Sequence, residues 1–180
     1  MAAAGRVHAG SKHYSAEERA LYDSLPELKR QRVLVGGADS MRLALSLKAR
    51  YPHLSVTVVD KSQPQLMKAL DLANREGQPM KFIGGSCDQL PFGDESFDIV
   101  VSGKPLTIRG NEKSIEAMNE FYRVLRKSGH VVVIAKATRR NFIHTMEGSG
   151  FENVGERKYG SLHVFSGTKI ELEQMLSQPG

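Results

Sequence analysis

The stretch from Arg32 to Asp60 constrains the fold of this chain more than any other. A short apolar run, Val33 to Val35, meets two glycines, and a helical pattern of apolar residues from Met41 to Leu47 follows. A second apolar run ends on Asp60, 24 positions after Gly36. This order of strand, glycine turn, helix, strand and acid predicts a βαβ unit.

The same stretch indicates a nucleoside site. Gly36 and Gly37 allow the backbone to approach a ligand closely, and the N-terminus of the following helix attracts anionic groups. Asp60, at the tip of the second strand, can accept hydrogen bonds from both hydroxyls of a ribose. The alternative interpretations are a plain tight turn and a solvated cap for the next helix.

The length and composition indicate one globular domain. The chain has 180 residues, which we divide into a helical lead-in at 1–30 and a main domain at 31–180. Apolar residues make up 40% and charged residues 25%, as in soluble proteins. The longest apolar run, Val131 to Ala135, is far shorter than the roughly 20 residues of a membrane-spanning helix.

The single cysteine, Cys87, excludes an internal disulfide and fits a reducing cytoplasm. The histidines are scattered, apart from His8 and His13, so we expect no metal site. Residues 1–15 carry basic residues and no acid but lack an apolar signal core, so a cytoplasmic location is expected and an organelle transit sequence is the alternative.

Helical and strand-like patterns alternate along the rest of the chain. We expect helices at 15–29, 63–76, 112–127 and 141–148, and strands at 80–83, 97–101 and 130–135. A hairpin is expected at 152–159 and 162–167, followed by a short helix at 169–177. This alternation predicts an open, mostly parallel α/β sheet with helices on both faces. Ligands of such sheets bind at the carboxyl ends of the strands.

The net charge of +5 is unevenly distributed. No acid occurs between Glu120 and Glu147, whereas this interval contains Arg123, Arg126, Lys127, Lys136, Arg139 and Arg140. A basic region attracts anions, although a solvated surface is the alternative interpretation. No motif with interleaved aromatic residues supports a nucleic-acid partner.

Five sequence blocks follow one another from about Arg32 to Lys169: VLVGGADS, VTVVD, CDQLPFGDESFDIVVSG, EFYRVLRKSGHVVVIAK and GFENV. In this order they resemble class I S-adenosylmethionine-dependent methyltransferases of the small-molecule type. The resemblance implies a Rossmann-like three-layer sandwich. Its seven-stranded sheet would have the order 3-2-1-4-5-7-6, with the last-inserted strand antiparallel.

The resemblance also implies S-adenosylmethionine as the cofactor. The glycine turn would lie under it, Asp60 would hold the ribose hydroxyls, and the loop after the third strand would lie beside the adenine. The implied cofactor-binding residues are Gly36, Gly37, Ala38, Asp60, Lys61, Ser86, Cys87, Asp88, Ser102 and Gly103.

Basic residues of two loops at the same end of the sheet are candidate substrate contacts: Lys104, Arg109, Lys136, Arg139 and Arg140. Their common sign predicts a small anionic acceptor, and solvation of the loop surface is the alternative. Methyl transfer mainly requires positioning, so we assign no catalytic residue. Few residues are available to enclose a small substrate, so we expect a homo-oligomer or a partner subunit.

Several positions depart from the pattern of that family. Leu34 stands where the first strand usually has an acid, Ala38 and Ser40 replace the second and third glycines, and Ser86 replaces an aspartate. These departures support a second hypothesis, in which the fold is kept and catalysis is lost. The chain would then be a pseudo-methyltransferase that acts as a binding or scaffold subunit.

Overall fold

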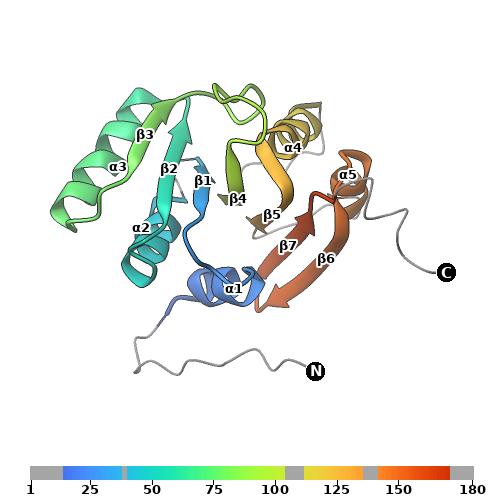
Figure 1. The fold of residues 1–180 in the computed structure, drawn as a ribbon. Helices are drawn as coiled ribbons and strands as arrows, with labels where there is room; N and C mark the ends of the chain where they lie inside the picture. Colours follow the sequence, from blue (N-terminus) through green and yellow to red (C-terminus); the bar gives the residue numbers. More distant parts are fainter. Residues whose placement is uncertain (1–13, 38–39, 104–111, 136–141, 171–180) are drawn as a thin grey trace.

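The computed structural model of the chain describes residues 14–37, 40–103, 112–135 and 142–170. Seven strands form one sheet in the order β3-β2-β1-β4-β5-β7-β6 (Figure 1). Neighbouring strands from β3 to β5 are parallel, and β7 runs antiparallel to both β5 and β6. The predicted fold class and strand order are therefore confirmed.

The elements alternate as the sequence predicts. The strands are β1 Arg32–Gly36, β2 Ser55–Asp60, β3 Lys81–Gly84, β4 Phe97–Gly103, β5 Leu125–Ala135, β6 Glu152–Tyr159 and β7 Leu162–Thr168. The helices are α1 Ala16–Ser24, α2 Met41–Arg50, α3 Gln63–Arg75, α4 Glu112–Val124 and α5 Phe142–Gly148. The expected closing hairpin is present as β6 and β7, whereas the helix expected at 169–177 lies beyond the described residues from position 171 onward.

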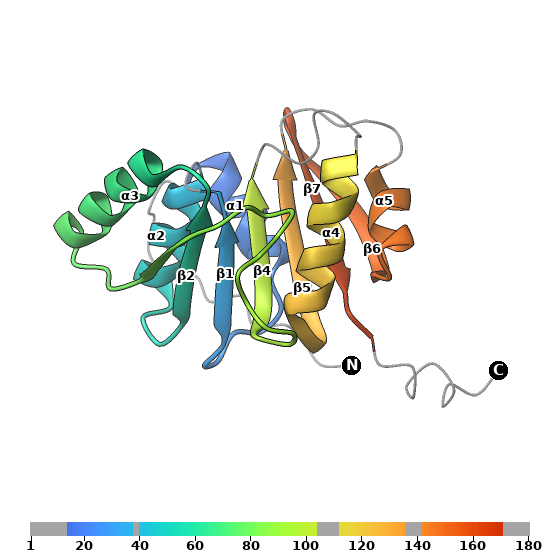
Figure 2. The ribbon, with the colours of Figure 1, turned by 90° about the horizontal axis from the view of Figure 1, so that it is seen from above.

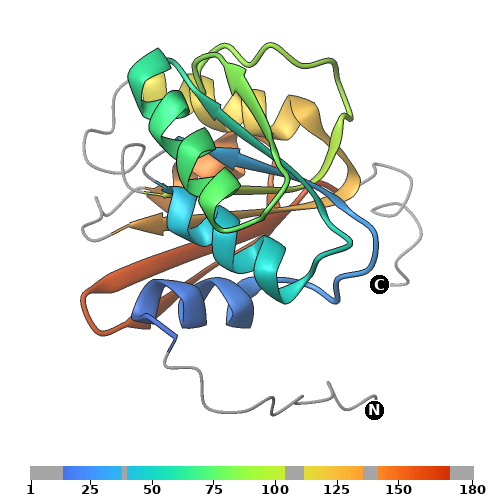
Figure 3. The ribbon, with the colours of Figure 1, turned by 90° about the vertical axis from the view of Figure 1, so that its left-hand side faces the viewer.

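Helices cover both faces of the sheet (Figures 2 and 3). Helices α1, α2 and α3 pack on one face, and α4 and α5 pack on the other. Because successive side chains of a strand point to opposite faces, Val33 and Val35 join the first apolar cluster and Leu34 joins the second. The hydrophobic effect on both faces fixes the register of the central strands.

Strand β5 has the most continuous apolar run of the sheet. Val131 to Ala135 are each at most 3% exposed, between β4 and β7. A parallel strand that is covered on both faces needs such a run in place of alternating polar residues.

Helix α1 begins at a capping box formed by Ser15 and Glu18. The Ser15 hydroxyl accepts a hydrogen bond from the Glu18 amide at 3.1 Å, and the Glu18 carboxylate accepts one from the Ser15 amide at 2.7 Å. The helix ends at Ser24, five residues earlier than position 29, the expected end. Leu25 precedes Pro26 and adopts extended backbone, because the proline ring disfavours a helical residue before it.

Helix α4 is also shorter than predicted, because it ends at Val124 and β5 begins at Leu125. The ammonium group of Lys169 donates to the carbonyl oxygens of Tyr122 at 3.0 Å and Leu125 at 2.7 Å. These bonds satisfy carbonyls that the end of a helix leaves without partners. Ser128, which follows the expected end of the helix at position 127, lies within β5 at a positive φ of 62°.

Candidate functional site

The carboxyl ends of β1, β2 and β4 meet at one edge of the sheet. Gly36, the last residue of β1, pairs with Val59 of β2 and with Ser102 of β4. Asp60 and Gly103 follow these two partners directly. Residues that lie far apart in the sequence are thereby brought to one end of three adjacent strands.

The two glycines of the turn after β1 have different structural roles. Gly37 has a φ of +88°, which favours glycine, and its amide donates to the Val59 carbonyl oxygen at 2.8 Å. A Cβ on Gly37 would have no neighbour within 4 Å among the described residues, whereas one on Gly36 would lie 3.1 Å from Cys87 Sγ and 3.4 Å from the Phe121 ring. The loop that carries Cys87 therefore packs directly against the glycine turn.

Ser40 connects this turn to β4, a role that the sequence analysis missed. Its side chain is buried, at 4% exposure, and its hydroxyl accepts a hydrogen bond from the Gly103 amide at 3.0 Å. The hydroxyls of Ser40 and Ser102 each donate to the Gly36 carbonyl oxygen at 3.4 Å. The serine at the position of the third glycine was the only signal in the sequence for this contact.

Asp60 lies at the tip of β2, where α3 begins. Its carboxylate accepts a hydrogen bond from the Ser62 amide at 2.7 Å, and its own carbonyl oxygen accepts one from the Gly85 amide at 3.0 Å. The first bond orients the carboxylate, and the second joins β2 to the beginning of the loop after β3. Lys61, the next residue, is exposed.

The predicted adenine-edge residues Ser86, Cys87 and Asp88 form a tight turn. The Gln89 amide donates to the Ser86 carbonyl oxygen at 3.2 Å, and the two residues form an isolated bridge. Burial, together with the charges of Asp60 and Asp88, raises the pKa of the Cys87 thiol to about 12. Cys87 is therefore a neutral thiol at neutral pH and packs as an apolar side chain beside Gly36.

Other predicted site residues lie outside the described residues: Ala38 and the candidate substrate contacts Lys104, Arg109, Lys136, Arg139 and Arg140. Within the described part of the acid-free stretch, Arg123 and Arg126 form ion pairs. Arg123 pairs with Glu120 and Asp94, and Arg126 pairs with Asp98. The charges of these two arginines are therefore compensated by Glu120 of α4 and by Asp94 and Asp98, which lie earlier in the chain.

Two features are absent from the part of the chain that the structure describes. It contains no group of three or more His, Cys, Asp or Glu side chains able to hold a metal ion. None of its helices has the length and apolar character needed to cross a membrane.

Comparison with known proteins identifies the family. Residues 33–129, more than half of the chain, match the model of a methyltransferase domain. The demethylmenaquinone methyltransferase of Thermotoga maritima is 30% identical over 108 residues, which cover 60% of this chain and 44% of that protein. The match thus spans less than half the length of this relative.

Two solved structures share the fold at low identity. A chain of the complex between the Haloferax volcanii Trm112 methyltransferase activator and a methyltransferase has a TM-score of 0.74 at 14% identity, covering 87% of this chain and 89% of its own length. The [4+2]-cyclase SpnF has a TM-score of 0.73 at 16% identity, and the match covers 86% of this chain and 80% of the cyclase chain. Since one of these is a cyclase by name, the fold alone does not fix the reaction.

The family match covers the glycine turn, Asp60 and the loop after β3, which are the residues that meet at the carboxyl edge of the sheet. The family and the fold together imply S-adenosylmethionine as the cofactor. On this evidence the chain belongs to the methyltransferase domain family, in its class I, S-adenosylmethionine-dependent division.

Proposed function

We propose that this chain transfers a methyl group from S-adenosylmethionine to a small anionic acceptor. The observation that carries the proposal is the position of Asp60 beside the Gly36 and Gly37 turn, at the carboxyl ends of adjacent parallel strands. The name of the Thermotoga relative, a demethylmenaquinone methyltransferase, supports a small-molecule acceptor. The negative charge of that acceptor is inferred from the basic residues of the two loops alone.

The residues at this edge fit a nucleoside. Asp60, oriented by the Ser62 amide, would accept hydrogen bonds from the ribose hydroxyls. Gly37, which has no side chain, would allow the backbone to approach the ligand closely, and Ser86 to Asp88 would lie beside the base. Ser102 and Gly103 would lie under the methionine part, with Lys61 at the exposed rim.

The bound cofactor supplies an electrophilic methyl group on a sulfonium ion. The residues of the chain would hold this group in line with the acceptor, and positioning of that kind supplies a large part of the rate of such reactions. A general base is required only where the acceptor must lose a proton first.

Calorimetric titration with S-adenosylmethionine and S-adenosylhomocysteine tests this proposal. We expect binding that Asp60→Ala weakens about a hundredfold or more, because two charge-assisted hydrogen bonds are lost. Asp71→Ala, which removes an exposed acid from α3, is the matched control and should leave the affinity unchanged.

If neither ligand binds at concentrations up to millimolar, the hypothesis that the chain is an active methyltransferase is rejected. This result would favour the alternative of a catalytically inactive pseudo-methyltransferase that acts as a scaffold subunit.

The protein would work in association with a second copy or a partner subunit, in the cytoplasm. The structural neighbour solved with the Trm112 activator supports a partner, and the single cysteine supports a reducing compartment. Light scattering of the purified chain tests the association, and a monomer with full activity on a small acceptor would contradict it.

A further inference from the structure

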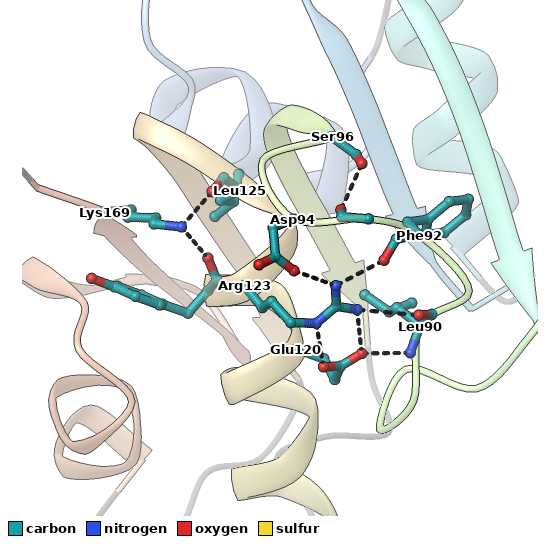
Figure 4. Close-up of polar contacts among 10 residues, drawn as sticks. Leu90, Phe92, Asp94, Ser96, Glu120, Arg123, Leu125 and Lys169 are labelled. Carbon is teal, nitrogen blue, oxygen red and sulfur yellow. Dashed lines mark hydrogen bonds and ion pairs between the residues drawn. The ribbon is translucent and has the colours of Figure 1, made fainter.

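The loop between β3 and β4, residues 85–96, is fastened at both ends. At its beginning the Gly85 amide donates to the Asp60 carbonyl oxygen at 3.0 Å. At its far end the attachment is made by two side chains of α4, Glu120 and Arg123 (Figure 4). Between these points lies the tight turn of Ser86 to Gln89, which carries Cys87 against Gly36.

Arg123 makes most of the contacts at the far end. Its guanidinium donates to the carbonyl oxygens of Leu90 at 3.2 Å and Phe92 at 2.8 Å, and to the Asp94 carboxylate at 2.9 Å. The Arg123 carbonyl oxygen also accepts a hydrogen bond from the Glu95 amide at 3.1 Å. The planar, rigid fork of the guanidinium suits such a set of acceptors, whereas a lysine ammonium is a single point charge.

Glu120 holds Arg123 in place and adds a bond of its own to the loop. Its two carboxylate oxygens accept from Arg123 Nε at 2.7 Å and Nη2 at 2.8 Å. One of them also accepts from the Leu90 amide at 2.7 Å. Both polar groups of the Leu90 backbone are therefore bound by α4, directly after the turn that carries Cys87.

We propose that Arg123 is a positioning residue for the cofactor: with Glu120 it holds the β3–β4 loop against α4, so that Ser86 to Asp88 stay beside the Gly36 turn. The identity of the cofactor in this inference rests on the proposed function. The attachment of the loop itself follows from contacts within the chain. Arg123 touches neither Gly36 nor Asp60 in this scheme and acts only through the loop.

The single cysteine of the chain offers a direct readout of the loop. Cys87 is partly buried, packed against the second apolar cluster, and is protonated at neutral pH, so it should react slowly with a thiol reagent. A loosened loop exposes this thiol, whatever ligand the protein binds. Alkylation by iodoacetamide, followed by mass spectrometry, measures that exposure.

The experiment compares the full chain with Arg123→Ala, Arg123→Lys and Arg126→Ala. Arg126 lies three positions further along, and its ion pair with Asp98 does not involve the loop, so it is the matched control. For Arg123→Ala we expect alkylation of Cys87 to be about tenfold faster and the affinity for S-adenosylhomocysteine about tenfold or more weaker. Arg123→Lys should lie between Arg123→Ala and the unchanged protein, and Arg126→Ala should match the unchanged protein in both measurements.

Two results would overturn the proposal. The first is Arg123→Ala protein that folds, by circular dichroism, with unchanged alkylation of Cys87. The second is an equal acceleration in Arg126→Ala, which would show that loss of any ion pair suffices. If Arg123→Ala does not fold, Arg123→Lys decides by the same comparison.

If the unchanged protein binds no S-adenosylhomocysteine, the proposed function fails. The rate of Cys87 alkylation then still decides whether Arg123 holds the loop.

Discussion

Gly85 is the residue at which a single added methyl group should disturb the β3–β4 loop most. A Cβ at this position would lie 2.7 Å from Pro91 Cδ, 2.9 Å from Pro91 Cγ and 3.2 Å from Val59 Cγ2. Since carbon atoms in contact lie about 3.5–4.0 Å apart, Gly85→Ala requires a displacement of roughly 1 Å. Val59 is fully buried within β2, so the Pro91 side of the loop must move.

The cost of this displacement can be estimated. Overpacking of this kind destabilises the folded protein by about 1–3 kcal/mol. Replacing glycine with alanine also stabilises the fold by about 0.4–1 kcal/mol, because alanine lowers the conformational entropy of the unfolded chain. We therefore expect Gly85→Ala to lower the free energy of unfolding by about 1–2 kcal/mol, which corresponds to roughly 2–8 °C in Tm for a chain of this size. Urea denaturation followed by circular dichroism measures the free energy, and Cys87 alkylation reports the displaced loop.

Gly93, in the same loop, provides the matched control. Within the part of the chain that the structure describes, a Cβ there would meet only Ser96 Oγ, at 3.8 Å, which is an ordinary contact. We expect Gly93→Ala to be neutral or slightly stabilising. If the free energies of unfolding of Gly85→Ala and Gly93→Ala differ by less than about 0.5 kcal/mol, the steric reasoning is refuted, because ordinary surface substitutions change stability by up to that amount.

Two further predictions concern the core and the pH dependence of stability. The ring of Phe121 is fully buried beside the glycine turn, so Phe121→Ala should lower the free energy of unfolding by about 3–5 kcal/mol in urea denaturation. Ile115, on the same helix, is 50% exposed, so Ile115→Ala should change this free energy little. Burial lowers the pKa of His130, whose imidazole lies 3.0 Å from the Ser24 carbonyl oxygen, below its usual 6.5. The neutral ring therefore contributes stability that is fully present above about pH 6.5 and is lost as the pH falls below that value. Between about pH 7.5 and pH 5, the Tm of His130→Asn should decrease less than the Tm of the unchanged protein.

The fold was predictable because its signals are local. Apolar runs bounded by glycines gave the strands, and the alternation of strands and helices restricted the topology to few arrangements. The early end of α1 was also predictable in principle, since Pro26 restricts Leu25. The end of α4 was not predictable, because the ammonium group that binds its last carbonyls belongs to Lys169, 47 positions after Tyr122.

The candidate site was predictable only in part, for the same reason. Gly36 and Asp60 end neighbouring strands, so their proximity follows from the topology. The attachment of the β3–β4 loop by Arg123 depends on acceptors 29 to 33 positions earlier in the chain. The sequence shows the charges in their order along the chain, and in that order the basic stretch suggested anion binding. In the folded protein, Arg123 and Arg126 pair with Asp94 and Asp98, which belong to the β3–β4 loop and to β4.

Two of the departures from the family pattern, Leu34 and Ser40, have structural partners where β1 meets β4. Leu34 fills the second apolar cluster with no exposed surface, and Ser40 ties the glycine turn to Gly103 of β4. On the opposite side, at the tip of β2, Asp60 keeps both its position and the Ser62 amide that orients it. Because Leu34 and Ser40 consolidate the junction of β1 with β4 and Asp60 keeps its place at the tip of β2, we expect cofactor binding to depend most on Asp60, on the ribose side of the site. Replacement of Asp60 therefore separates an active from an inactive methyltransferase more sharply than any replacement in the altered glycine turn.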